Sequence, residues 1–150
     1  MLMAAYGMNT NRAQMAHRCP AAVSLGVAEL DNYRLVFRGC ADIHPTPGET
    51  IEVVLWDITD DCLAALDILE GYPSYYTRYE VPVFHDQEWK SALVYKMNYG
   101  DIFPPNAGYL RMLFEGYTEH GADVQQIYDA VDEAERAYAL LERYDSVVYE

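Results

Sequence analysis

The sequence predicts an α+β fold: a mixed, largely antiparallel sheet or small barrel with inserted helices and a C-terminal helix. Several short apolar runs alternate with the period of two that is typical of strands, and turn signals join most of them as hairpins. A stretch near the C-terminus instead repeats its apolar residues at helical spacing. No linker, repeat or low-complexity segment divides the chain, so we expect residues 1–150 to form a single domain.

In the first half of the chain, the patterns predict four strands and one short helix. An apolar start enters a loop at Tyr6, and an Asn or Thr after this loop caps a helix that reaches about His17. Asp31-Asn32 is a two-residue turn signal between two alternating runs. The loop 44–48 precedes a run that is apolar on both parities, which is typical of a strand covered on both faces. The strands expected after the helix cover residues 22–30, 33–39 and 51–58.

In the second half, the patterns predict two more strands and three helices. Thr59 is expected to cap a helix that Gly71 and Pro73 bring to an end. The strand 79–84 contains Pro82, which indicates an edge strand or a bulge. The remaining expected elements are a hairpin turn at 86–88, its second strand over 90–97, and helices over 109–117 and from 124 to about 144.

Charge and composition exclude several classes of partner. The 24 acidic and 10 basic residues give a formal net charge of −14, which argues against binding to nucleic acid or to an anionic membrane. No apolar run approaches the length of about 18 residues that a spanning helix needs, and the polarity near the start argues against a signal peptide. The expected location is therefore cytoplasmic. The three cysteines and four histidines lack metal-ligand spacing, so we expect no metal and no disulfide framework.

Glu70 is the residue to which the sequence most directly assigns chemistry. It ends the expected helix before Gly71, where the helix dipole disfavours an ionised carboxylate by roughly 0.3–1 kcal/mol when exposed. Burial against Tyr72, Tyr75 and Tyr76 would raise its pKa further. A glutamate that takes up protons near neutrality is a candidate general base. The alternative from this stretch alone is a solvent-facing glutamate before an ordinary glycine C-cap.

Glu70 also belongs to a series of seven short motifs that follow one another along the chain. They are Tyr6-Gly7-Met8-Asn9, Arg18-Cys19-Pro20-Ala21, Tyr33-Arg34-Leu35-Val36-Phe37, Val54-Leu55-Trp56-Asp57-Ile58-Thr59, Leu66-Asp67 with Glu70-Gly71, Ala92-Leu93-Val94-Tyr95-Lys96-Met97, and Pro104-Pro105 with Tyr109. In this order and spacing, the chain resembles the gamma-glutamylcyclotransferase-like superfamily over roughly residues 4–130. No single motif is specific, and the evidence lies in their order.

The resemblance implies an enzyme of transferase or lyase type that cyclises a γ-glutamyl group to 5-oxoproline and releases an amine or amino acid. Glu70 falls on the family's general acid/base. The implied substrate-binding residues, the first four largely through backbone groups, are Tyr6, Gly7, Met8, Asn9, Tyr95 and Tyr109. The partner is a small γ-glutamyl compound, and no cofactor is implied. Met8 stands where the family often has Ser, a change that a backbone contact would survive and a hydroxyl contact would not.

Alternatives stay open from the sequence, which specifies neither the leaving group nor the oligomeric state. A non-catalytic, acidic protein-binding domain on the same fold would use the nine acidic residues from Glu119 onward. A cysteine hydrolase would use Cys19 or Cys40, although no His/Asp set accompanies either residue. Tyr75 and Tyr76 are further candidates for the pocket wall. Tyr128 and Tyr138, on the apolar stripe of the last helix, are expected to pack in the core, and Arg12 and Arg78 to be surface charges.

Overall fold

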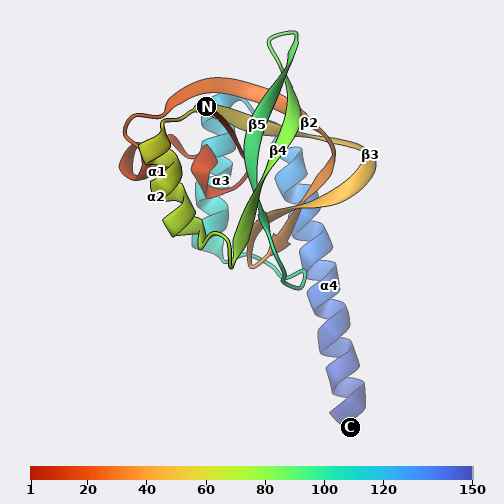
Figure 1. Cartoon of the computed structure of the whole chain (residues 1–150). Coiled ribbons are helices and arrows are strands. Elements are labelled where there is room, and N and C mark those ends of the chain that lie inside the picture. Colours follow the sequence, from red (N-terminus) through yellow and green to blue (C-terminus); the bar gives the residue numbers. More distant parts are fainter. Residues whose placement is uncertain (150) are drawn as a thin grey trace.

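Five strands close into a barrel in the order β1-β3-β2-β4-β5 (Figure 1). The computed structural model describes residues 1–149. The strands are β1 (Leu2–Ala5), β2 (Val23–Arg38), β3 (Cys40–Asp57), β4 (Tyr76–His85) and β5 (Glu88–Met97). Neighbouring strands are antiparallel except β1 and β5, which meet in parallel. The predicted α+β fold with a mixed, largely antiparallel small barrel is therefore confirmed.

Local sequence signals set the starts of three helices and the ends of two, whereas α4 continues past the expected end near residue 144. They are the 3-10 helix η1 (Met8–Thr10) and the α-helices α1 (Arg12–Arg18), α2 (Asp60–Glu70), α3 (Ala107–His120) and α4 (Gln125–Tyr149). Asn11, Thr59 and Asn106 cap α1, α2 and α3, because each side chain accepts a hydrogen bond from the backbone N–H three residues later. Gly71 and Gly121 end α2 and α3 in the left-handed conformation, with φ of 66° and 72°. No helix of the described residues is long and apolar enough to cross a membrane.

The turn predicted at Asp31-Asn32 and the loop predicted at 44–48 are wrong. Strands β2 and β3 are single strands of 16 and 18 residues that pair along their length and reverse at Gly39, whose φ is 78°. Asn32 has a φ of 68° but sits at a register shift within β2. Asn tolerates the left-handed backbone conformation in a β-bulge as well as in a turn. The Asp31-Asn32 pair therefore marks a bulge within β2 and not the turn that the sequence predicted.

The edge or bulge predicted from Pro82 is also corrected by the structure. The β4–β5 hairpin keeps an unbroken register, with Pro82 opposite Ser91, and the barrel is closed. Strand β4 meets β2 through a single pair, Glu29 with Phe84. A strand that is so sparsely paired on one side tolerates a residue without an N–H group.

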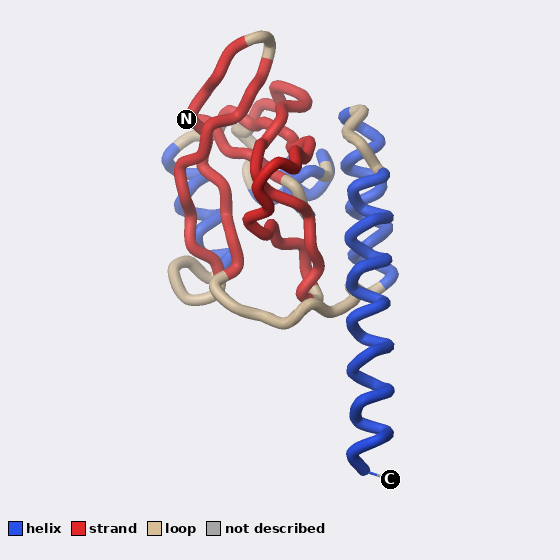
Figure 2. The backbone as a smooth tube through the Cα atoms, turned by 90° about the vertical axis from the view of Figure 1, so that its right-hand side faces the viewer, coloured by secondary structure: helices blue, strands red, loops and turns tan. Residues whose placement is uncertain are grey.

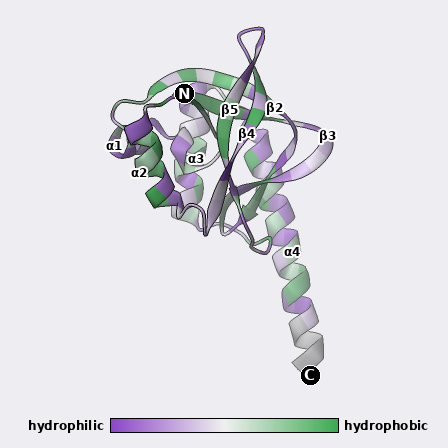
Figure 3. Cartoon of the chain, viewed as in Figure 1, coloured by the Kyte–Doolittle hydropathy of each residue, from purple (hydrophilic) through white to green (hydrophobic). Residues whose placement is uncertain are grey.

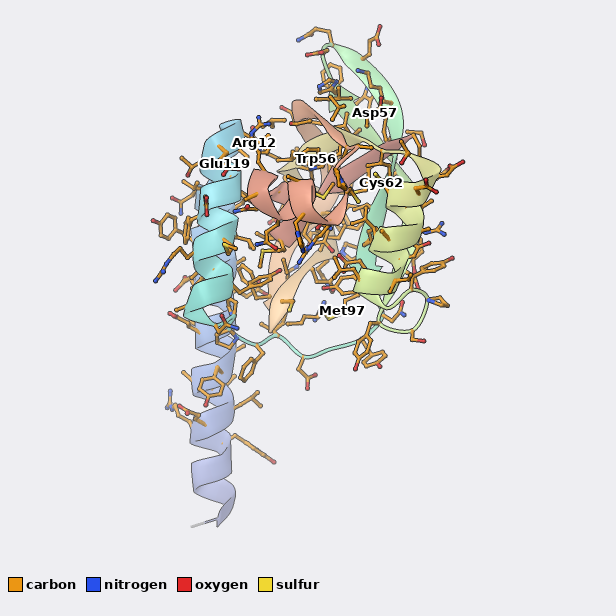
Figure 4. All side chains as sticks on the ribbon, turned by 90° about the vertical axis from the view of Figure 1, so that its left-hand side faces the viewer. Arg12, Trp56, Asp57, Cys62, Met97 and Glu119 are labelled. Carbon is orange, nitrogen blue, oxygen red and sulfur yellow. The ribbon has the colours of Figure 1, made fainter. Side chains whose placement is uncertain are left out.

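Two hydrophobic clusters hold the helices to the barrel. The larger fills the barrel and packs α3 and the first part of α4 against it, through residues such as Phe37, Leu113 and Ile127. The smaller lies between the barrel and helices α1 and α2 and includes Trp56 and Cys62, which lie close together in Figure 4. Leu66, fully buried in this second cluster, fixes the face of α2 one turn before Glu70, so that the helix end is held at the barrel wall.

Helix α4 runs past the barrel and away from it, as Figure 2 shows. Figure 3 shows polar and apolar residues intermixed on its projecting part. Tyr128 and Tyr138, which were predicted to lie in the core, are 56% and 40% exposed. They pack at the surface against Phe114 and Phe103, with ring centroids 4.9 and 5.3 Å apart. The helical period placed them correctly on the apolar stripe, but the barrel is too short to cover the whole stripe.

Candidate functional site

A cavity of about 330 Å³ opens where the end of β1, helix η1 and the C-terminal ends of α1 and α2 meet. The residues that line it come from segments spread along the chain between Met3 and Tyr109. All seven site residues that the sequence and its resemblance predicted line this one cavity: Tyr6, Gly7, Met8, Asn9, Glu70, Tyr95 and Tyr109. Arg18, Cys40 and Tyr76 also line it and were not among those seven.

Glu70 is the only carboxylate that lines the cavity among the described residues. It is the last residue of α2 and is half-buried, and its Oε1 accepts a hydrogen bond from Asn9 Nδ2 at 3.3 Å. Burial raises the pKa of Glu70 above its ordinary value, while the positive charge of Arg18 and the Asn9 hydrogen bond act in the opposite direction. Of the three tyrosines expected to bury it, only Tyr76 lines the cavity, and Tyr75 is 64% exposed.

Asn9 connects Glu70 to a cation. Arg18, the last residue of α1, donates from Nη1 to Asn9 Oδ1 at 2.6 Å. The side-chain amide of Asn9 therefore accepts a hydrogen bond from the Arg18 guanidinium through its oxygen and donates one to the Glu70 carboxylate through its nitrogen. Asn9 is 8% exposed, so these two contacts lie in a partly dehydrated setting where charge-assisted hydrogen bonds are strong. Arg18 belongs to the motif Arg18-Cys19-Pro20-Ala21, from which the sequence predicts no role for its side chain.

Tyr6 and Tyr109, two of the predicted tyrosines, differ in the hydrogen bonds that their hydroxyl groups make. Tyr6 Oη donates to the carbonyl oxygen of Tyr95 at 2.6 Å, so its proton is used inside the protein. Tyr109 Oη accepts from the backbone N–H of Ala41 at 2.9 Å, which leaves its own proton available to a ligand. Burial raises the pKa of both groups, so both remain neutral hydrogen-bonding groups at physiological pH.

The third predicted tyrosine, Tyr95, is part of an ion-pair network behind Glu70. Tyr95 Oη donates to Asp67 Oδ1 at 2.7 Å. Arg78 donates to both oxygens of the same carboxylate, at 2.7 and 2.9 Å, so it is paired here and is not free for a ligand. These hydrogen bonds from Arg78 hold the pKa of Asp67 below its usual range. The network ties the last turn of α2 to strands β4 and β5, and so fixes where Glu70 lies.

The loop after β1 approaches the cavity closely because it contains glycine. A Cβ atom at Gly7 would lie 3.1 Å from Ala41 Cβ and 3.2 Å from Tyr109 Oη. The backbone N–H groups of Met8 and Asn9 donate to no other described residue, since the first hydrogen bonds of η1 come from later residues. The side chains of His, Cys, Asp and Glu form no group of three suited to a metal ion in the described part of the chain.

Comparison with known proteins places this chain in a family. Residues 3–118 match the family model described as "Gamma-glutamyl cyclotransferase, AIG2-like". The chain is 30% identical to a gamma-glutamylcyclotransferase of Bos taurus over 136 residues, covering 81% of this chain and 72% of the relative. A gamma-glutamylcyclotransferase of Homo sapiens is 29% identical with the same coverage. A solved structure of a gamma-glutamyl cyclotransferase superimposes with a TM-score of 0.78 at 25% identity, covering 85% of each chain.

Proposed function

The chain belongs to the gamma-glutamyl cyclotransferase, AIG2-like family, and on that premise we propose that it cyclises a γ-glutamyl group to 5-oxoproline with Glu70 as general acid/base. The observation that supports this most strongly is a half-buried carboxylate of raised pKa at a cavity wall, facing a loop with free N–H groups. The substrate is a small γ-glutamyl compound, and the second product is the released amine or amino acid.

The reaction needs one group that both accepts and returns a proton. The α-amine of the substrate is an ammonium at neutral pH, so Glu70 first accepts a proton from it. The free amine then attacks the γ-carbonyl carbon of the same molecule and closes a five-membered ring. Glu70 returns the proton to the departing nitrogen as the C–N bond breaks. It then takes the second proton from the ring nitrogen and passes it to the released amine, which leaves as an ammonium. The raised pKa of Glu70 brings its proton affinity closer to that of an amine, which favours the first transfer.

The other cavity residues position the substrate. The free N–H groups of Met8 and Asn9 suit an oxyanion or carboxylate oxygen, and this backbone contact does not need the serine often found at position 8 in the family. Tyr109 can donate its hydroxyl proton to the substrate, whereas the hydroxyl groups of Tyr6 and Tyr95 are engaged within the protein. We assign these last two to shaping the cavity wall. Ring closure is then favoured because the cavity holds the amine and the carbonyl of one molecule together.

A survey of leaving groups tests this proposal. The purified protein is incubated with γ-glutamyl amino acids, γ-glutamyl amines and γ-glutamyl-lysine peptides, and 5-oxoproline is measured. At least one class is expected to give 5-oxoproline at a rate that scales with enzyme concentration. Inactivity of the folded protein towards every class, together with salt-sensitive binding to a basic protein, would support the acidic binding domain instead.

Asp67→Asn is expected to lower kcat/KM by about 10- to 100-fold while substrate binding changes little, because Glu70 loses the anchor one turn before it. Thermal melting should show a loss of stability as well. The ionised Asp67 has a lowered pKa, so the stability it contributes is present above its unfolded pKa of about 3.9 and is lost as the pH falls through the folded pKa. The stability difference between wild type and variant should therefore shrink at low pH.

Asp61→Asn is the matched control for Asp67→Asn, because Asp61 is exposed in the first turn of the same helix. It should leave kcat/KM unchanged within about twofold, since exposed substitutions away from special features have small effects. Equal activity of the two variants would show that the Asp67 network does not position Glu70.

Cys40 offers a chemical test of the cavity. It is exposed and lines the cavity, whereas Cys19 and Cys62 are buried. Although the residue is exposed, partial desolvation of its thiol at the cavity raises the pKa of Cys40, and nearby Glu70 adds to this, which disfavours the thiolate that a cysteine nucleophile requires. A maleimide should modify Cys40 alone in the folded protein, seen by mass spectrometry, and should block 5-oxoproline release by filling the cavity.

The variant Cys40→Ser distinguishes two reasons for inhibition by the maleimide: a filled cavity, or the loss of a catalytic thiol. We expect this variant to retain activity within a few fold and to resist the maleimide. Loss of activity in Cys40→Ser with an intact fold would favour the cysteine hydrolase over the proposed aminolysis.

A further inference from the structure

Among the residues that the structure describes, Arg18 differs from the other partly buried arginines in having no carboxylate partner. Arg34, Arg38 and Arg78 each form an ion pair, with Glu133, Asp42 and Asp67. Arg18 is half-buried like them, yet among the described residues it donates only to the neutral side chain of Asn9.

A guanidinium carries five N–H donors in a planar fork that matches a carboxylate, and Arg18 uses one of them within the described protein. A partly dehydrated cation without a paired anion is unfavourable unless a ligand supplies the anion. Because Arg18 lines the cavity, the cavity is where such an anion would bind. Each of the three paired arginines has a carboxylate partner within the fold, and Arg18 has none among the described residues.

We propose that Arg18 binds the α-carboxylate of the γ-glutamyl group, so that the enzyme selects substrates in which this carboxylate is free. The inference rests on the proposed function. The position of Glu70 identifies which carboxylate is meant. The α-amine that Glu70 deprotonates and the α-carboxylate are attached to the same carbon atom, so their binding groups must be close neighbours.

Asn9 provides that spacing. Its amide lies between Arg18 Nη1, at 2.6 Å from Oδ1, and Glu70 Oε1, at 3.3 Å from Nδ2. A cation and an anion separated by one amide match a ligand that presents an ammonium and a carboxylate from one carbon. A carboxylate on the leaving group is missing from γ-glutamyl amines, whereas every γ-glutamyl substrate carries the α-carboxylate beside its α-amine.

Two consequences follow for the reaction. With the α-carboxylate on Arg18, the free N–H groups of Met8 and Asn9 remain available for the oxyanion that develops on the γ-carbonyl. The positive charge of Arg18 also lowers the pKa of Glu70, and a bound carboxylate offsets that charge. Substrate binding would thus make Glu70 a stronger base at the moment when it must accept a proton.

The test compares a γ-glutamyl substrate from the survey with its α-carboxamide, which keeps the amine and the γ-carbonyl. Wild type should prefer the carboxylate by about 100-fold in kcat/KM, since a hydrogen-bonded charge pair is lost in the amide. In Arg18→Gln this preference should fall to within a few fold of unity, and Arg18→Lys should be intermediate. The same ratios should appear, independently of turnover, in the binding of 5-oxoproline and 5-oxoprolinamide measured by calorimetry.

Two further variants exclude indirect effects. Arg12→Gln removes an exposed arginine from the same helix, which Figure 4 shows beside Glu119 on α3, and it should keep the wild-type preference. Asn9→Ala should lower turnover of both substrates while preserving a preference for the carboxylate. Circular dichroism and melting curves confirm that each variant is folded.

An unchanged preference in folded Arg18→Gln, or an equal loss on both substrates, would overturn the inference and leave the proposed function intact. If wild type released no 5-oxoproline from any γ-glutamyl compound, the proposed function itself would fail. The calorimetric ratio separates the two cases, because it reports whether Arg18 recognises the carboxylate without requiring turnover.

Discussion

Glu70→Gln is expected to lower kcat for 5-oxoproline release by about 100- to 10,000-fold, with little change in substrate affinity. The amide keeps the size of the side chain and its contact with Asn9 but cannot accept a proton from an ammonium. Single-turnover assays and calorimetry with the same substrate separate the loss of chemistry from any loss of binding. Near-normal turnover in this variant would contradict the assignment of the base.

The stability of Glu70→Gln is the internal control. The pKa of Glu70 is raised in the folded protein, so its contribution to stability is present below the unfolded pKa of about 4.3 and is lost as the pH rises through the folded pKa. Above the folded pKa the ionised carboxylate therefore costs stability, and there Glu70→Gln should melt at or above the wild-type temperature. For wild type, kcat/KM should fall as the pH drops through the pKa of Glu70, because only the ionised form is a base.

Gly116→Ala is expected to destabilise the protein by about 1–3 kcal/mol, although alanine is the better helix former by up to about 1 kcal/mol. Gly116 is buried on α3, and a Cβ atom there would overlap Thr10 Oγ1 and lie 2.8 Å from the backbone nitrogen of Asn11. These residues directly follow the loop 6–9, so the same change should displace the cavity wall and reduce activity. The expected fall in Tm is roughly 2–12 °C.

Gly108→Ala is the matched control on the same helix. Gly108 is exposed, and its Cβ would meet only Asn106 Oδ1, at an ordinary contact distance of 3.5 Å. Here the gain in helix propensity is unopposed, so Tm should stay the same or rise. Equal stability of the Gly116 and Gly108 variants would show that α3 does not pack against η1 as tightly as the structure indicates.

The parts of the fold that depend on local chemistry were predictable from the sequence. Thr59 and Gly71 define α2 because a cap and a left-handed glycine act on backbone groups within a few residues. Asp31-Asn32 was misread because a turn and a bulge share the same local backbone, and only the distant partner strand distinguishes them. The exposure of Tyr138 likewise depends on how far the barrel reaches along α4, which no local pattern records.

The candidate site was likewise predictable where the signal was local, and not where it depended on contacts between distant residues. Glu70 was a candidate from its own surroundings, and the resemblance supplied the residues around it. The functions of individual hydroxyl groups and charges were not readable, because their partners are distant in sequence. Tyr95 donates to Asp67, 28 residues away, and Asn9 reaches Glu70 across 61 residues. The sequence does contain one indication for Arg18. It is a cation at the end of helix α1, and α1 closely follows the loop after β1.

Product identity in isotope-labelled water tests the central claim most directly. The protein is incubated with its best γ-glutamyl substrate in H₂¹⁸O, and the products are identified by mass spectrometry. Intramolecular aminolysis predicts unlabelled 5-oxoproline and released amine in equal amounts, with neither formed above background by Glu70→Gln. Labelled glutamate in place of 5-oxoproline would show that water, and not the substrate amine, attacks the carbonyl, and would contradict the account.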